Sequence, residues 1–440
     1  MTPPPTSDAA GVEPTFREPP ADAAEPAADQ PAEPPAGPPP VPLTEPRDGV
    51  PAPLVAAADL APVVEGLAAG SGPVAIDAER ASGYRYGQAA YLVQLRRADI
   101  GTVLIDPREL PDLAALGAAI GSDEWVLHAA SQDLPCLAEL GLRPERVFDT
   151  ELAGRLLGYA RVGLGAIVEE VLGLSLEKGH SAADWSTRPL PEPWLRYAAL
   201  DVEVLVELRD VLAAQLDEQG KREWAEQEFA AIVAAPPAPP RVDPWRRTSG
   251  LHRVRKRRQL AVVRSLWERR DEVARRRDIA PGRVLPDSAI VAAALAAPRT
   301  EEDLVALPVW GGRSMRRQTS TWLPAIEAGL ALPDDQLPEP KTPHEGPPPA
   351  RSWGDREPAA AARLAAARAA VGAVAEEHRL PVENLVSPDT VRRLAWDPPP
   401  DADAEVVAGF LRAHGARDWQ VGLTAEVLAA ALVPAAADPS

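Results

Sequence analysis

The stretch "GPVAIDAERASGYRYGQAAYLVQLRRADIGTVLIDP", residues 72–107, contains three apolar runs joined by short loops. Runs of this length that are rich in Val, Ile, Leu and Tyr predict β-strands, and the short loops favour an antiparallel meander. Further along, "WVLHAA" (125–130) predicts a strand that leads into a helical pattern. Because a strand that follows a helix can pair in parallel with an earlier strand, the region predicts an α/β domain with a mixed sheet.

Proline-rich segments divide the 440-residue chain, which is too long for a single hydrophobic core. Residues 1–53 contain mainly Pro, Ala, Asp and Glu, a composition that predicts a disordered arm. We assign residues 54–235 to the α/β domain, 245–330 and 353–434 to two all-helical modules, and 331–352 to a Pro-rich linker.

The two helical modules look like a repeat. "LAVVRSLWERRDEVARRRDIAPGRVLPDSAIVAAAL" can be laid over "LAAARAAVGAVAEEHRLPVENLVSPDTVRRLAW" with small gaps. In each copy a long helical pattern ends in a Pro-containing loop, and a Pro-Asp pair begins the next helix. Only the first copy is rich in basic residues, so it is better suited to bind nucleic acid.

The distribution of charge supports that reading of the first module. The chain has a net charge of −19, but residues 241–278 contain 14 Arg or Lys and 5 Asp or Glu, a local balance of +9. A solvated helix face is the alternative explanation for such a run. Contacts made by these side chains would be with phosphates, without sequence preference. The candidate residues are Arg253, Arg255, Lys256, Arg257 and Arg258.

Two further features restrict the class of protein. The single cysteine, Cys136, excludes an intramolecular disulfide and a Cys-rich zinc site. The N-terminal "MTPPPTSDAAGVEPTF" has no basic region followed by an apolar one, and no apolar run approaches a membrane-spanning length. We therefore expect a cytoplasmic protein with no membrane partner.

Asp77 and Glu79 follow the apolar run of the first expected strand. Side chains two apart on a strand point to the same face, so the two carboxylates project together. Such a pair attracts a compensating charge, and Mg²⁺ and Mn²⁺ prefer these oxygen ligands. A solvated strand end is the alternative.

Two more acidic residues, Asp133 and Asp201, are candidates for a functional site. Asp133 opens the helix after "HAASQ", where it could also serve the helix start. Tyr197 and Asp201 are four residues apart in a helical pattern and share a face. Asp201 lies among Ala, Leu and Val, where an uncompensated carboxylate is costly and a metal ion would remove the cost.

Together these residues resemble the three exonuclease motifs of the DEDD superfamily in its tyrosine-bearing branch. The segments "AIDAERASGYRYGQAAYLVQL", "HAASQDLPCL", "FDTELAGRLLG" and "DWSTRPLPEPWLRYAALDVEVL" are similar to ribonuclease D in particular. The helical modules look like the HRDC modules that follow the nuclease domain in that family. The resemblance covers roughly residues 54–330 and, more faintly, the second module. The sister branch has His five residues before the last Asp, where this chain has Arg196.

The resemblance implies a ribonuclease H-like exonuclease domain followed by two all-α HRDC-like modules. It implies that two divalent cations, Mg²⁺ or Mn²⁺, are held by four carboxylates and that Tyr197 orients the attacking water. The expected partner is RNA with a single-stranded 3′ end, such as a tRNA precursor. The four expected metal ligands are Asp77, Glu79, Asp133 and Asp201.

Other residues are weaker candidates for substrate contact, each with a structural alternative. Asp149 in "FDTELAGRLL" is typical of a helix N-cap. The possible substrate-binding residues of the α/β domain are His128, Gln94, Lys178, Trp185 and Arg188.

Two other functions remain open on the sequence. DNA is a possible substrate because the catalytic motifs do not read the sugar. A nucleic-acid-binding scaffold without activity is the other alternative, although all five catalytic positions are filled.

Overall fold

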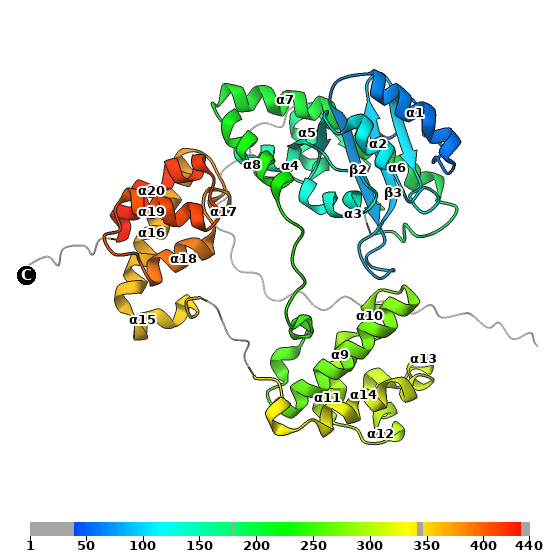
Figure 1. Cartoon of the computed structure of the whole chain (residues 1–440), viewed down its shortest axis with the longest axis vertical. Helices are drawn as coiled ribbons and strands as arrows, with labels where there is room; N and C mark the ends of the chain where they lie inside the picture. The colour runs from blue at the N-terminus through cyan, green and yellow to red at the C-terminus, as the bar shows by residue number, and fades with distance from the viewer. Residues whose placement is uncertain (1–38, 178, 181, 341–345, 433–440) are drawn as a thin grey trace, which may run out of the picture. The chain divides into compact units, whose positions relative to one another are not determined.

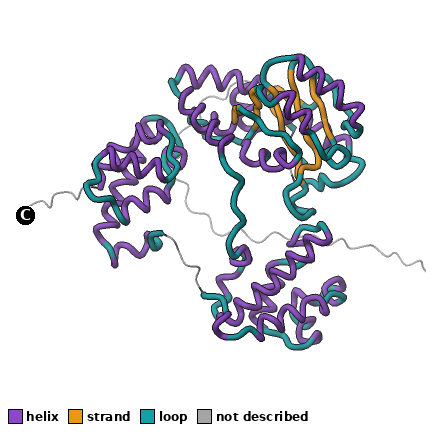
Figure 2. Tube along the Cα trace, viewed as in Figure 1, coloured by secondary structure: helices purple, strands orange, loops and turns teal. Residues whose placement is uncertain are grey.

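The chain is described by a computed structural model that covers residues 39–177, 179–180, 182–340 and 346–432. A five-stranded mixed sheet with the order β4-β3-β2-β5-β6 forms its α/β part (Figure 2). β2 pairs antiparallel with β3 and parallel with β5, and β3 pairs antiparallel with β4. The expected meander and added parallel strand are thereby confirmed. The strands are β2 (Val74–Arg80), β3 (Ala90–Arg97), β4 (Gly101–Ile105), β5 (Glu124–Leu127) and β6 (Arg146–Asp149).

Helices pack on this sheet and bury the central strand on both faces (Figure 1). In β2, Val74, Ala75, Ile76 and Ala78 are buried, so its apolar run is nearly continuous, as is typical of a strand covered on both sides. The helices are α1 (Ala57–Ala69), α2 (Ala114–Ile120), α3 (Leu134–Glu139), α4 (Thr150–Leu157), α5 (Leu164–Leu172), α6 (Glu192–Glu203), α7 (Leu205–Glu218) and α8 (Arg222–Ala234).

The expected disordered arm is partly wrong. Residues 1–38 lie outside the described residues, but β1 (Val41–Leu43) pairs in parallel with β7 (Leu174–Leu176). A three-residue strand that contains a proline can pair at an edge because only some of its backbone N–H groups are needed. Ordered structure therefore begins before residue 53.

Two helical modules follow, and their described residues contain no strand. Buried residues of the first module, among them Leu266, Trp310 and Trp322, form a core of their own. The first module contains α9 (Arg257–Arg277), α10 (Pro281–Val284), α11 (Asp287–Ala296), α12 (Glu301–Val305), α13 (Arg313–Arg316) and α14 (Thr319–Ala331). The second contains α15 (Trp353–Arg356), α16 (Pro358–Glu377), α17 (Val382–Leu385), α18 (Pro388–Trp396), α19 (Ala404–Ala413) and α20 (Asp418–Leu432).

The turn after the long helix has the same geometry in both modules. Asp278 after α9 and Arg379 after α16 have left-handed backbone conformations, with φ of 50° and 53°. The next residue then donates its N–H back to the helix, from Ile279 to the Ala274 carbonyl at 3.1 Å and from Leu380 to the equivalent Ala375 carbonyl at 2.8 Å. The shared turn supports the repeat inferred from the sequence.

The second module shares its hydrophobic core with the α/β domain. Trp419 stacks on Trp224 of α8, with ring centroids 5.0 Å apart and an interplanar angle of 15°. Trp419 Nε1 also donates to the Glu228 carboxylate at 3.0 Å. Lys221 donates to the carbonyls of Leu156 and His378 at 2.7 Å each, so it joins the two parts by hydrogen bonds.

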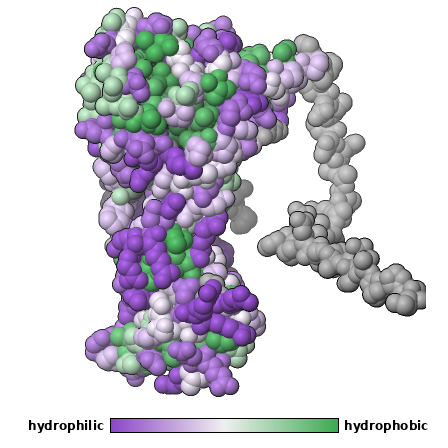
Figure 3. Space-filling view, turned by 90° about the vertical axis from the view of Figure 1, so that its right-hand side faces the viewer, coloured by the Kyte–Doolittle hydropathy of each residue, from purple (hydrophilic) through white to green (hydrophobic). Residues whose placement is uncertain are grey.

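On the face drawn in Figure 3, hydrophilic residues are interspersed with hydrophobic ones, which are most frequent in the upper part of the view. Scattered apolar side chains of this kind are normal on a protein surface. Among the described residues, no helix combines the length and the apolar character needed to cross a membrane.

Candidate active site

One cleft of about 720 Å³ brings the five expected catalytic residues together. β2 supplies Asp77 and Glu79, and α6 supplies Tyr197 and Asp201. Asp133 lies at the start of α3. The sequence spacing of each pair places it on one face of its strand or helix, and the sheet brings the two faces together.

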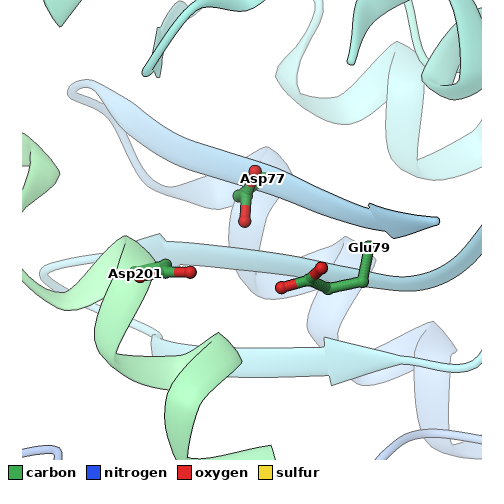
Figure 4. Close-up of side chains that lie close together, drawn as sticks. All are labelled: Asp77, Glu79 and Asp201. Carbon is green, nitrogen blue, oxygen red and sulfur yellow. The ribbon is translucent and has the colours of Figure 1, made fainter. Parts of the chain in front are cut away.

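Three of the carboxylates converge. One oxygen from each of Asp77, Glu79 and Asp201 lies within 4.8 Å of the others. Figure 4 shows these side chains reaching into a common space from the strand and the helix. Asp133 completes the set from the other side, where its carboxyl group is hydrogen bonded to that of Asp77.

The turn that carries Asp133 is fixed by a second aspartate. Ala129 has a left-handed φ of 59°, and a short 3₁₀ turn connects it to Asp133. The Asp149 carboxylate accepts hydrogen bonds from the N–H groups of Ala129 and Ala130, at 3.1 and 2.9 Å. It also accepts from two N–H groups of the first turn of α4. The expected N-cap role of Asp149 is confirmed, and the same side chain holds the Asp133 turn.

Burial dominates the electrostatics of the cleft. It raises the pKa of Asp77 and, more strongly, those of Glu79 and Asp201, and neighbouring carboxylates raise the last two further. Burial and the nearby Asp77 raise the pKa of Asp133 to about 8. These shifts all favour the protonated carboxyl groups, because ionising every member would leave buried charges with little compensation.

Hydrogen bonds restrain the acidic side chains. Gln94 Nε2 on β3 donates to Asp77 Oδ2 at 2.7 Å. The Tyr197 hydroxyl is bonded to Asp201, and burial together with the neighbouring carboxylates raises the pKa of Tyr197. Tyr197 therefore stays protonated and acts as a hydrogen-bond donor.

The donor set fits a divalent cation. The ligands that Mg²⁺ and Mn²⁺ prefer are oxygens, and every converging group here is a carboxylate. The raised pKa values show that the ionised carboxylates are destabilised by burial, and a bound cation would stabilise them. The oxygens of Asp77, Glu79 and Asp201 lie close enough together to hold such a cation.

The structure contradicts direct substrate contact for three candidates. Gln94 is 0% exposed, beside Asp77 on the neighbouring strand, and Trp185 is 0% exposed in a cluster with Trp194 and Tyr197. All five N–H donors of Arg188 are used: they bind both oxygens of Asp106 and the carbonyls of Tyr91, Trp185 and Thr187. Gln94 and Trp185 instead contact the cleft residues Asp77 and Tyr197 from within the protein, and Arg188 binds the loop and strand ends around Trp185.

The other two candidates of the α/β domain have different outcomes. His128 lines the cleft, and burial lowers its pKa to about 4, so the ring is neutral. Its Nδ1 lies 2.9 Å from Thr150 Oγ1, which leaves Nε2 for other partners. Lys178 lies outside the described residues.

The basic segment divides into two groups. Arg253, Arg255 and Lys256 are exposed. Arg257 instead donates to the Leu337 carbonyl at 2.8 Å, and Arg258 binds the Leu332 carbonyl and Asp334. The guanidinium groups of Arg257 and Arg258 hold their own chain, which is at odds with a role in binding substrate.

Arg80 lines the cleft but was not among the residues expected there from the sequence. It follows Glu79 directly, and its Nη2 lies 3.1 Å from Asp133 Oδ1. A basic residue adjoining two clustered carboxylates was the signal that could have identified it.

Comparison with known proteins gives three family matches. Residues 55–217 match the 3′-5′ exonuclease family and residues 259–326 the HRDC domain. Residues 346–432 match a model described as the 3′ to 5′ exonuclease C-terminal domain. The second helical module, which we expected to be HRDC-like, thus matches a different description from the first.

Several relatives resemble most of the chain. Ribonuclease D of Gluconacetobacter diazotrophicus is 33% identical over 336 residues, which cover 74% of this chain and 82% of that protein. A crystal structure of a protein from Bifidobacterium adolescentis is 40% identical, with a TM-score of 0.84, and covers 89% of this chain and 99% of its own. Escherichia coli RNase D, described as an exoribonuclease involved in structured RNA processing, is 26% identical with a TM-score of 0.63. The match covers 86% of this chain and 97% of that structure.

The exonuclease match covers the cleft, the HRDC match follows it in the chain, and the ribonuclease D relatives span both. The chain belongs to the ribonuclease D family of 3′→5′ exoribonucleases.

Proposed function

We propose that this chain removes 5′-mononucleotides from the 3′ ends of tRNA precursors and other stable RNAs by two-metal-ion hydrolysis. The convergence of Asp77, Glu79 and Asp201 within 4.8 Å carries the proposal. The description of the Escherichia coli relative as a processor of structured RNA supports the substrate class.

The carboxylates have the first role in the proposed reaction. Asp77, Glu79, Asp133 and Asp201 would hold two divalent cations, Mg²⁺ or Mn²⁺. When bound, such cations activate a water molecule and offset the charge that develops on the leaving 3′ oxygen. The Gln94 amide holds Asp77 in place, so the ligand does not need to reorient when the cations bind.

Tyr197 orients the water in this proposal. Its protonated hydroxyl is committed to Asp201, so its remaining lone pair can accept a hydrogen bond from the attacking water. Water adds to the phosphorus of the terminal phosphodiester and gives up one proton to solvent, the bond from that phosphorus to the preceding 3′ oxygen breaks, and the leaving oxygen takes up one proton from solvent. Tyr197 does not act as the base, because its raised pKa keeps the proton in place.

The exposed residues Arg253, Arg255 and Lys256 would bind phosphates in the body of the RNA. Binding there places the 3′ end near the cleft without selecting a sequence.

The test is a degradation assay on 5′-labelled RNA with a single-stranded 3′ tail and on DNA of the same sequence. With Mg²⁺ or Mn²⁺ we expect stepwise shortening of the RNA and release of 5′-mononucleotides, and with EDTA no shortening. Asp201→Asn, which removes a charge with little change in shape, should lower kcat by roughly 10²- to 10³-fold.

Glu177→Gln is the matched control, because Glu177 lines the same cleft outside the carboxylate cluster. Its activity should equal that of the unaltered protein. Full activity in Asp201→Asn, or shortening in EDTA, would contradict the proposal. Binding without shortening would identify an inactive scaffold, and faster loss of DNA would identify a DNA exonuclease.

A further inference from the structure

Arg80 has an unusual set of contacts for a half-buried arginine. Its side chain is 25% exposed, and its one ion pair, to Asp133, joins two atoms 3.1 Å apart. In the described part of the chain, no group accepts a hydrogen bond from its guanidinium. In Arg188, by contrast, every N–H donor is used. Arg80 therefore retains donors for a further partner.

The same side chain is the sole cation paired with the carboxylate cluster, as far as the structure describes the chain. Arg155 also lines the cleft, but Glu151 accepts from its Nε and Nη2 at 2.9 and 2.6 Å. Burial raises the pKa of Asp133, and the positive charge of Arg80 opposes that rise. In the cation-free protein Arg80 thus provides part of the missing counter-charge.

Arg80 also lies where two cavities meet. The cleft of about 720 Å³ and a second cavity of about 300 Å³ share Ala78, Glu79 and Arg80 as lining residues. The second cavity is otherwise lined by Tyr84 and small residues of the neighbouring loops. A long side chain at this junction can reach either space without a change in the backbone.

We infer that Arg80 is an exchangeable counter-ion: a divalent cation displaces it from Asp133, and the freed guanidinium then binds a phosphate of the RNA strand where the two cavities meet. The cation and the guanidinium compete for one carboxylate, whereas a phosphate offers the guanidinium a bidentate partner. Arg80 is thus a substrate-positioning residue whose contribution depends on the cation. The inference rests on the proposed metal-dependent function.

Two binding measurements test this role without turnover. Mn²⁺ is titrated calorimetrically into the full-length protein, and RNA affinity is measured by anisotropy in EDTA and in Ca²⁺. In Arg80→Gln we expect Mn²⁺ to bind roughly three- to tenfold more tightly, because its competitor is gone. We expect RNA affinity in Ca²⁺ to fall roughly tenfold, with little change in EDTA.

Two further variants separate the parts of the inference. Arg155→Gln removes the same charge from the same cleft. It should leave the affinities for Mn²⁺ and RNA unchanged, because the Arg155 guanidinium is already paired with Glu151. Arg80→Lys keeps the charge, so Mn²⁺ affinity stays low, but it loses the bidentate contact and part of the RNA affinity.

Equal Mn²⁺ affinity in the unaltered protein and Arg80→Gln would overturn the counter-ion role. Equal RNA affinity of the two in Ca²⁺ would overturn the phosphate contact. If the unaltered protein binds no Mn²⁺ at all, the proposed function itself fails, and that result is distinct from the other two.

Discussion

The cleft and the basic segment of the first helical module both concentrate charge, but they place it differently. In the cleft, Glu79 and Asp133 are buried, at 8% and 5% exposure. In the basic segment, Arg253, Arg255 and Lys256 face solvent. Burial makes a charge costly, so the carboxyl groups of the cleft are stabilised either by taking up protons or by binding cations. Exposure leaves a charge screened by salt, so in the proposed function the basic segment would contribute to RNA affinity and not to the rate of cleavage.

The largest predicted difference between the two regions is their response to pH. The pKa of Asp133 is raised to about 8, so below pH 8 the cation-free cleft holds a proton that a cation must displace. Affinity for Mn²⁺ should therefore fall as pH decreases, by up to about 100-fold from pH 8 to pH 6 for one displaced proton.

The measurement is a calorimetric titration of Mn²⁺ at pH 6, 7 and 8, with RNA affinity measured in EDTA at the same pH values. RNA affinity should stay constant, because Arg and Lys remain charged throughout this range. If the Mn²⁺ affinity is the same at all three pH values, protonation of Asp133 does not control cation binding in the cleft.

Tyr197→Phe should produce the next largest effect and should change rate alone. The substitution keeps the ring packed beside Trp185 and His180 and removes only the hydroxyl group. Single-turnover kcat should fall roughly tenfold to a hundredfold, because the attacking water loses its orientation. The affinities for RNA and Mn²⁺ should not change. A weakened RNA affinity with normal kcat would assign Tyr197 to binding instead.

The smallest predicted effect comes from the basic segment and should change affinity alone. Replacing Arg253, Arg255 and Lys256 by Gln should weaken RNA binding by about tenfold and lower the slope of log affinity against log salt by about 2. Single-turnover kcat at saturating RNA should stay the same. Anisotropy titrations over a range of salt concentrations provide the measurement.

Arg257→Gln combined with Arg258→Gln is the matched control. These guanidinium groups bind the segment from Leu332 to Glu339, so their loss should lower the melting temperature more than the salt slope. A salt slope reduced as much as in the triple variant would show that exposure does not distinguish the two groups.

Features encoded locally could be predicted from the sequence. Alternating strand and helix patterns were sufficient for the mixed sheet, and the spacings of Asp77 with Glu79 and of Tyr197 with Asp201 were sufficient to place each pair on one face. The capping role of Asp149 was also predictable, because a cap acts on the two or three residues that follow it.

Features that depend on distant partners could not be predicted. Arg188 was a candidate for substrate contact because it lies in a polar, basic loop, with a role in stabilising that loop as the alternative, and its partner Asp106 is 82 residues away. Trp185 belongs to an apolar cluster with Tyr91 and Leu104, which lie far from it in the sequence and which the fold brings together with it. The pairing of β1 with β7 joins segments more than a hundred residues apart. The sequence shows which chemical groups such residues carry, but not which distant residue each group contacts in the folded chain.

The core shared by α8 and the second helical module has a topological consequence. The first module lies between them in the chain, so both of its ends return to the same body. A single cut in either Pro-rich connection would leave the first module covalently attached through the other, and the remaining fragments would stay associated through the Trp224–Trp419 stack. If the exposed basic residues of the first module bind RNA as proposed, this double tethering keeps them at a high effective concentration relative to the cleft, so an RNA released after one cleavage would be recaptured before it diffuses away.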